Sequence, residues 1–288
     1  MRIDLQVHST YSDGYLTPTQ LVKFLASKKI KVASLTDHNT VAGFHEFKHA
    51  CLKNNIKAVP GIELYVKLKH KKFNLLWYNF DYNHPDLHLM LRDSQKRRKC
   101  LIRKGLNALR KIGFSIDVNK TLDKYAHYTP INKVVDDFLS NPKNLARVKK
   151  ELKTKLIREE DVISKYFRNP EIYSLKNSFI GFERIVKLRK KIGGQLILCH
   201  PAKHSYIDKD FLKRLKEMGL DGLEMMSPHH SLGAIMYLQA LSRELDFIAT
   251  GGSDFHRSEG GTYPLQKSWD YFFISNRFLR KINEIIKN

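Results

Sequence analysis

The sequence has few cysteines and no long apolar run. Its three cysteines, Cys51, Cys100 and Cys199, are widely separated and match no zinc motif. We therefore expect a reducing, cytoplasmic compartment. No apolar run approaches the roughly 20 residues that a membrane helix needs, so we expect no membrane association. The first ten residues contain an acid and no long apolar stretch, and we expect no secretory signal there.

Acidic residues are also scarce. The chain has 29 acidic against 51 basic residues, a formal net charge of +22. Such a charge attracts polyanions and their fragments, so we expect a phosphorylated small molecule or a nucleic-acid fragment as partner. A generally lysine-rich composition would give the same total. Hydrophobic residues make up 42% of the chain, enough for a core, which excludes disorder as a description of the whole chain.

Short apolar runs alternate with helical patterns at both ends of the chain. The predicted strands cover residues 2–7, 32–36, 56–66, 195–199, 222–226 and 247–250, with a further apolar run at 73–80. The predicted helices between them cover residues 19–29, 41–54, 182–192 and 232–245. This alternation predicts parallel βαβ units. The number of strands favours a barrel or a barrel-like parallel sheet.

The middle of the chain has a different character. Leucines recur there at helical spacing, and residues 92–111 are dense in arginine and lysine. We predict a barrel formed by residues 1–81 and 179–288, with residues 82–178 inserted as a basic helical subdomain. Its basic helices are suited to follow a phosphate backbone, with aromatic residues such as Tyr166 and Phe167 stacking on bases. A solvated charged face over aromatic core residues would give the same pattern.

Histidine, aspartate and glutamate residues gather where predicted strands end. These residues are His8, Asp13, His38, Glu63, His200, Asp254 and His256. In a parallel barrel the carboxyl ends of the strands share one face, so these side chains are expected to converge. Such a concentration of imidazoles and carboxylates is costly unless a cation lies among them. Mixed nitrogen and oxygen ligands suit Mn, Fe or Zn, so the pattern predicts a divalent metal site.

The same segments resemble the motifs of a known family. The matching segments are residues 4–9 with 12–14, 35–38, 61–63, 199–201 and 251–256. They are similar to the motifs of PHP (polymerase and histidinol phosphatase) domains, and most of all to the branch of small bacterial nucleoside 3′,5′-bisphosphate phosphatases and 5′–3′ exoribonucleases. The resemblance implies an α/β fold, a distorted (β/α)₇ TIM-like barrel. It also implies a trinuclear metal site and hydrolysis of phosphate esters.

The resemblance assigns ligands to each of the three ions. The first ion would be held by Asp13, His38 and His256, and this set is complete. The second would be held by His8, Glu63 and Asp254, and the third would share Glu63.

Three positions depart from the family pattern. Gln6 replaces one histidine of the second ion, and Asn74 and Asn132 replace those of the third. Amide oxygens are weaker donors than imidazole for these metals. We therefore expect one or two ions, with the third position empty.

The resemblance also assigns roles toward the substrate. His200 is expected to act as an additional ligand or proton donor and, with Asp254, as a catalytic residue. Lys203, Lys165 and Arg168 are expected to contact the phosphate. The chain is thus predicted to be a metal-dependent phosphoesterase that uses metal-activated water on a nucleotide, an oligonucleotide or a small phosphorylated metabolite. The alternative is a pseudoenzyme that binds anions or nucleic acid without multinuclear catalysis.

Overall fold

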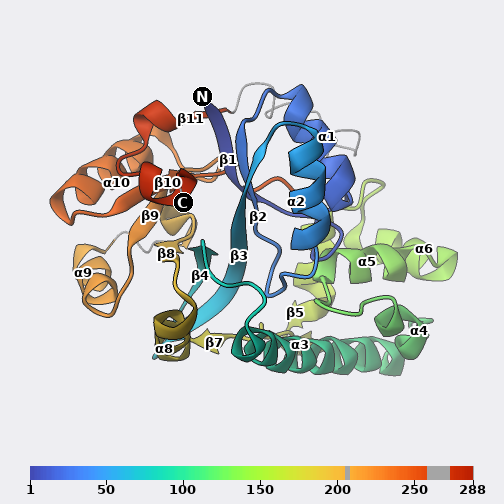
Figure 1. Ribbon diagram of the computed structural model, residues 1–288. Helices are drawn as coiled ribbons and strands as arrows, with labels where there is room; N and C mark the ends of the chain where they lie inside the picture. Colours follow the sequence, from blue (N-terminus) through green and yellow to red (C-terminus); the bar gives the residue numbers. More distant parts are fainter. Residues whose placement is uncertain (205–207, 258–272, 288) are drawn as a thin grey trace. The chain divides into compact units, whose positions relative to one another are not determined.

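The computed structural model describes residues 1–204, 208–257 and 273–287 (Figure 1). The chain divides into two compact units, Met1–Met90 with Phe179–Asn288, and Leu91–Ser178. The insertion was predicted over residues 82–178; the helix that opens it, α3 (Pro85–Lys111), begins in the first unit and ends in the second. No helix in the described ranges is both long and apolar enough to cross a bilayer.

The first unit is built on one mixed sheet. Its strands are β1 (Arg2–Val7), β2 (Val32–Leu35), β3 (Lys57–Leu68), β4 (Lys71–Tyr78), β7 (Ile180–Gly181), β8 (Gln195–Leu198), β9 (Gly222–Met226), β10 (Ile248–Gly251) and β11 (Ile274–Ser275). They follow the order β10-β9-β8-β4-β3-β2-β1-β11, with β7 beside β3. Neighbours among β1, β2 and β3 are parallel, as are neighbours among β8, β9 and β10. The two groups also run in the same direction, because β4 is antiparallel to both β3 and β8, so these six strands end on the same face.

Strand β4 differs from the expected parallel arrangement. It pairs antiparallel with both β3 and β8. Only Lys69 and His70 separate β3 from β4, and Lys69 has φ of 53°. A parallel connection needs a crossover of a dozen or more residues, whereas two residues suffice for a hairpin. The prediction of parallel units throughout was therefore wrong at this strand.

The sheet nearly closes between its first and last parallel strands. The N–H of His8 donates to the carbonyl of Phe255 at 2.8 Å, and Val7 forms a parallel bridge with Phe255. The N–H of Ser253 donates to Asp4 at 2.9 Å. These bonds join the end of β1 to the loop after β10. The predicted α/β barrel, TIM-like but distorted, is confirmed.

Helices cover the outside of this sheet. They are α1 (Pro18–Ser27), α2 (Phe44–Lys53), α8 (Phe182–Ile192), α9 (Lys209–Glu217), α10 (Leu232–Glu244) and α12 (Asn283–Ile286). Helix α1 begins at a capping box in which Thr17 and Gln20 satisfy each other's backbone N–H groups, with Pro18 at the first helical position. Helices α1 and α2 pack side by side (Figure 1), and their buried Leu21 and Phe47 join one apolar core. This core anchors the loops that follow β1 and β2.

The second unit is mainly helical and has its own core. Besides most of α3 it contains α4 (Val118–Asp123), α5 (Ile131–Leu139), α6 (Pro142–Leu152), α7 (Glu159–Val162), a π-helical turn (Ile163–Phe167) and the short strands β5 (Arg168–Asn169) and β6 (Tyr173–Ser174). Tyr166 and Phe167 are buried in this core beside Leu106 and Phe138. The alternative of core aromatics therefore applies to these two residues, which do not present a surface for stacking bases.

Candidate metal centre

A buried hydrogen-bond network shapes the loop after β1. Asp37 accepts hydrogen bonds from the N–H of Ser9 at 2.7 Å and from its hydroxyl at 2.6 Å. The hydroxyl of Ser12 donates to the same carboxylate at 2.5 Å. Asp37 thus links the loop after β1 to the end of β2 through Ser9 and Ser12, which explains why serine occupies both positions.

Gly14 lets this loop fold back over the end of β1. A Cβ atom at residue 14 would lie 2.2 Å from the carbonyl oxygen of His8, far inside van der Waals contact. Because only glycine fits there, the preceding residue, Asp13, is held beside the His8 ring. The turn therefore has a specific task, which is to place a carboxylate over the end of the first strand.

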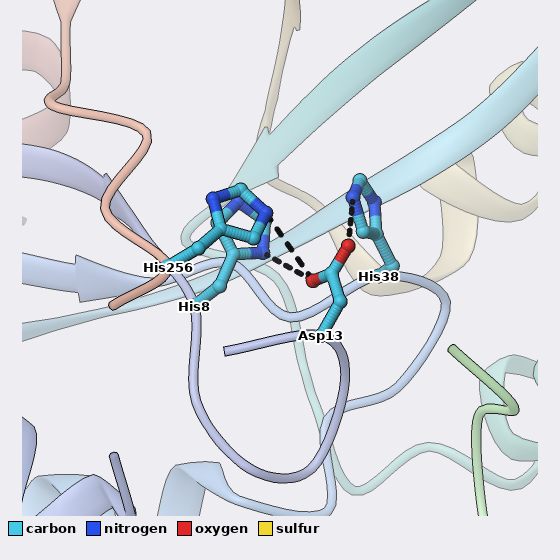
Figure 2. Close-up of side chains that lie close together, drawn as sticks. All are labelled: His8, Asp13, His38 and His256. Carbon is cyan, nitrogen blue, oxygen red and sulfur yellow. Dashed lines mark ion pairs between the residues drawn. The ribbon is translucent and has the colours of Figure 1, made fainter. Parts of the chain in front are cut away.

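Asp13 is the centre of a first group of candidate ligands, formed with His8, His38 and His256 (Figure 2). Its Oδ1 lies 3.3 Å from Nε2 of His256 and 3.7 Å from Nδ1 of His8. Its Oδ2 lies 3.4 Å from Nε2 of His38. The rings of His8 and His256 stack with centroids 4.2 Å apart, and the Asp13 carboxylate points between this pair and His38 (Figure 2).

The ring orientations in this group leave nitrogen lone pairs available. Nδ1 of His256 donates to the backbone carbonyl of Asp254 at 2.7 Å, which leaves its Nε2 as an acceptor facing Asp13. His8 is fully buried, yet within the described part of the chain neither of its ring nitrogens has a hydrogen-bond partner of good geometry. Buried polar atoms are normally satisfied, so these two nitrogens fit ligands of ions.

A second group shares His8 and adds Glu63 and Asp254. Nε2 of His8 lies 3.2 Å from Oε2 of Glu63 and 3.1 Å from Oδ1 of Asp254. Without an ion, burial lowers the pKa of His8, but both carboxylates outweigh burial and hold it well above its ordinary value, so an ion that binds His8 has to displace its proton. Burial raises the pKa of Glu63 and of Asp254, but the surrounding imidazoles outweigh it and keep both carboxyls ionised.

A third group consists of Glu63, Cys199 and His200, all of them buried. His200 Nε2 lies 3.6 Å from Oε1 of Glu63, and the Cys199 thiol lies 3.5 Å from the same oxygen. The expected replacements Gln6 and Asn74 also surround Glu63. They approach it with amide nitrogens, at 3.0 Å and 2.5 Å respectively, and not with the oxygens that would bind an ion.

Glu224 is a buried carboxyl at this site that the sequence prediction missed. It lies in β9, is fully buried, and accepts the backbone N–H of His200 at 2.8 Å. Burial and the charge of Asp254 raise its pKa well above the ordinary value, which favours the neutral acid. The Cys199 thiol lies 3.7 Å away. The available signal was an acid inside the otherwise apolar strand 222–226.

His229 was missed as well, although it follows the end of β9 as the other histidines follow their strands. Its Nε2 donates to Oδ2 of Asp254 at 2.6 Å. The ammonium of Lys203 lies 3.2 Å from the same nitrogen and 3.8 Å from Asp254. Lys203 is therefore at the exposed side of the second group.

Two predicted catalytic residues have unusual backbone conformations. His200 has φ of 26° and Asp254 has φ of 52°, values in the left-handed region that favours glycine. Such conformations cost free energy and persist where the surroundings enforce them. Here the hydrogen bonds of Glu224 to the N–H of His200 and of His229 to the Asp254 side chain hold these residues in place.

Three predicted site residues belong to the second unit. Asn132 lies in α5, Lys165 donates to the carbonyl of Glu151 at 2.8 Å, and Arg168 pairs with Glu160 at 2.6 Å. Their assignment to an ion position or to phosphate binding stays a prediction.

The donor sets fit divalent ions. Neighbouring ligands around an ion with bonds of about 2.1 Å lie about 3.0–3.4 Å apart, whereas good hydrogen bonds are shorter. The contacts of His256 and His38 with Asp13, at 3.3 and 3.4 Å, fall in that range. The mixture of imidazole and carboxylate suits Mn, Fe or Zn. Which metal binds, and to which group, stays a prediction.

Comparison with known proteins agrees with this geometry. The PHP domain model matches residues 4–239. The chain is 27% identical over 270 residues to a 5′-3′ exoribonuclease of Haemophilus influenzae, covering 88% of this chain and 90% of that protein. It is 26% identical over 262 residues to phosphoribosyl 1,2-cyclic phosphate 1,2-diphosphodiesterase of Eggerthella lenta, covering 89% and 95%.

A solved structure shows the same fold. An amidohydrolase from Chromobacterium violaceum with bound sulfate matches 100% of this chain and 96% of its own, with a TM-score of 0.76 and 20% identity. The predicted barrel and the predicted family are both confirmed. The chain belongs to the PHP domain family.

Proposed function

We propose that the protein is a metal-dependent phosphoesterase that hydrolyses phosphate esters with metal-activated water. The observation that carries this proposal is the complete group of His8, Asp13, His38 and His256 directly beside Glu63 and Asp254. Phosphate esters repel hydroxide, so a catalyst must generate hydroxide at neutral pH and neutralise charge on the phosphate oxygens. A buried cluster of imidazoles and carboxylates that binds divalent ions meets both needs.

Each ion has a defined set of residues in this proposal. Asp13, His38 and His256 hold the first ion, and His8, Glu63 and Asp254 the second, giving one or two ions of Mn, Fe or Zn. When bound, such ions lower the pKa of coordinated water to about 7 and polarise the phosphate.

The substrate side of the site is assigned to His200 and Lys203. His200 is held rigidly by its backbone bond to Glu224, which suits a ligand or a proton donor to the leaving oxygen. Lys203 contributes an exposed positive charge beside Asp254 for a phosphate oxygen. Lys165 and Arg168 are proposed, as expected from the family pattern, to contact the phosphate.

The proposed substrate is a nucleotide, an oligonucleotide or a small phosphorylated metabolite. The names of the two curated relatives refer to a ribonuclease and to a cyclic phosphate diphosphodiesterase, so related chains act on phosphodiesters of different size. The net charge of +22 agrees with a polyanionic substrate.

A substrate panel with added Mn²⁺ tests the proposal. It comprises p-nitrophenyl phosphate, a nucleoside 3′,5′-bisphosphate and a short 5′-phosphorylated RNA. We expect Mn²⁺-dependent hydrolysis of at least one of them and a loss of about a thousandfold in Asp254→Asn with an unchanged fold. Asp210→Asn, a change of the same kind at an exposed position of α9, serves as the control. Hydrolysis unchanged in Asp254→Asn would contradict the proposal.

One observation favours the second candidate, a module that binds anions or nucleic acid without catalysis. Amide groups occupy two positions around Glu63 where the family has histidines. In that case no member of the panel is hydrolysed, while binding of short RNA is tight and weakens steeply as salt rises.

A further inference from the structure

Both carboxylate oxygens of Glu63 receive a side-chain amide. Nδ2 of Asn74 lies 2.5 Å from Oε1, and Nε2 of Gln6 lies 3.0 Å from Oε2. At 2.5 Å an amide oxygen facing an ionised carboxylate would be strongly repelled, so the NH₂ group of Asn74 must be the one that faces Glu63. Resting on the proposed function, we propose that Gln6 and Asn74 are positioning residues whose N–H groups hold Glu63 in place of a third ion.

The register of the sheet fixes Asn74 next to Glu63. In the antiparallel pair of β3 and β4, Glu63 lies opposite Leu76. Asn74 is two residues from Leu76 on the same strand, so its side chain emerges on the same face as that of Glu63. Diagonal neighbours of this kind are within reach of side chains as long as Glu and Asn. The contact is therefore built into the hairpin and does not depend on a flexible loop.

Gln6 is fixed from the opposite side. It is fully buried in β1, and the backbone of Gly252 packs directly on it; a Cβ at residue 252 would lie 2.3 Å from Cβ of Gln6. Its Nε2 also lies 3.1 Å from the sulfur of Cys199, which can accept a weak hydrogen bond. Gln6 thus has little freedom to turn its oxygen toward an ion without losing both contacts.

These contacts change what Glu63 can bind. A carboxylate that bridges two ions needs a lone pair of each oxygen for a different ion. Each oxygen has two lone pairs. Oε1 receives both the Asn74 amide and, at 3.5 Å, the Cys199 thiol, whereas Oε2 receives the Gln6 amide and keeps one lone pair on the side of His8, whose Nε2 is 3.2 Å away. Glu63 is therefore left as a ligand of one ion. The two amides supply, with neutral donors, the stabilisation that a third cation would supply with charge.

Charge variants of Asn74 test this role in the full-length protein. Asn74→Asp keeps the size of the side chain but places a second carboxylate against buried Glu63. In protein treated with chelator we expect the melting temperature to fall by about 10 °C, because two buried carboxylates then repel each other. Added Mn²⁺ should restore it, and metal analysis should find one more ion per chain than in the unaltered protein.

Three further variants separate positioning from weak ligation. Asn74→Leu removes the amide, and the number of bound ions should not change; Asn74→His restores an imidazole and should raise the number by one. Asn79→Asp is the matched control, because Asn79 is also half-buried but donates to the side-chain oxygen of Gln195 and to the carbonyl of Ile285, not to a carboxylate. We expect it to lose stability without recovery in Mn²⁺.

Specific results would overturn the proposal. If Asn74→Leu loses an ion, or if Asn74→Asp binds no additional ion while the unaltered protein binds Mn²⁺, the amides act as ligands or as packing only. Failure of the proposed function looks different: the unaltered protein then binds no Mn²⁺, whereas chelated Asn74→Asp is still destabilised and the contact with Glu63 stands.

Discussion

The surroundings of Asp13 and of Glu63 differ although both carboxylates lie at the same rim of the barrel. Asp13 faces three imidazoles whose nitrogens lie 3.3–3.7 Å away. Glu63 also has imidazoles nearby, with nitrogens of His8, His200 and His38 at 3.2, 3.6 and 3.9 Å. Unlike Asp13, it additionally has the amide N–H groups of Gln6 and Asn74 at hydrogen-bond distance. The first arrangement brings one ligand atom of each residue within 4.8 Å of the others, whereas the second gives the carboxylate hydrogen-bond donors from neighbouring side chains. We propose that the half of the rim around Asp13 binds a cation, and that in the half around Glu63 amide N–H groups take the place of one.

The largest expected effect comes from the half that is prepared for a cation. His256→Ala should remove one bound ion per chain and lower phosphoesterase activity about a thousandfold, because the lost imidazole is a ligand in the complete group. Metal analysis and the substrate panel measure both quantities. His49→Ala, at an exposed position of α2, is the control for loss of a histidine. An unchanged ion count in His256→Ala would remove the distinction between the two halves.

Asp4 is a buried carboxyl whose pKa is shifted by burial and not by imidazoles, and it extends the comparison from ion binding to stability. Burial raises the pKa of Asp4 from 3.8 to about 6, despite the N–H groups of Ser253 and Gln6 that donate to Oδ1. The folded state then holds this proton more tightly than the unfolded state does. The free energy of unfolding contributed by this group therefore falls as pH rises from about 4 to about 6.

Asp4→Asn should remove this dependence, since the amide oxygen can still accept both N–H groups. The variant should therefore gain stability relative to the unaltered protein as pH rises from about 4 to above 6, by about 3 kcal/mol at most. Urea unfolding of both chelated proteins across this range measures the difference. A difference that is constant with pH would show that Asp4 does not titrate as described.

Glu224 contacts Cys199 and His200, the neighbours of Glu63, and therefore provides a further test of that half of the rim. Glu224→Gln keeps an oxygen for the N–H of His200 and replaces a carboxyl whose raised pKa favours the neutral form, so activity should change little. Glu224→Ala removes the acceptor and should lower activity about 10- to 100-fold, as expected for a residue that orients a ligand. Steady-state kinetics with Mn²⁺ distinguish the two variants. Equal losses in both would mean that the charge, and not the hydrogen bond, matters.

The smallest effect is expected at the exposed side of the site. Lys203→Met should raise KM about five- to tenfold with little change in kcat, because the ammonium contacts the phosphate and no ion ligand is removed. Lys213→Met in α9 is a matched control at an exposed lysine. A fall in kcat with unchanged KM would instead place Lys203 in the chemical step.

Sequence reasoning located the strands well because β1 alternates polar and apolar residues and β9 is short and mainly apolar. Both were predicted with the bounds that the structure shows, as was helix α8. Strand direction follows from the same reasoning wherever a helix intervenes. It failed at β4, where a two-residue link forces a hairpin.

The gathering of His8, Asp13, His38 and His256 followed from parallel strands ending on one face. The roles of Gln6 and Asn74 did not follow, because spacing shows that an amide replaces an imidazole but not which amide atom faces Glu63. Glu224 could have been noticed as an acid inside an otherwise apolar strand, but its hydrogen bond to the backbone N–H of His200 could not be predicted from the sequence.

The closing contact of the barrel has a consequence for biosynthesis. Asp4 and Ser253 are bonded across 249 positions of the chain, and His8 meets Phe255 beside them. A nascent chain on the ribosome therefore carries the early ligands long before the late ones exist. The rim is assembled only after residue 256 has emerged, so the ion binding that we propose for it can occur only late in maturation, and a chain that stops earlier lacks the proposed site.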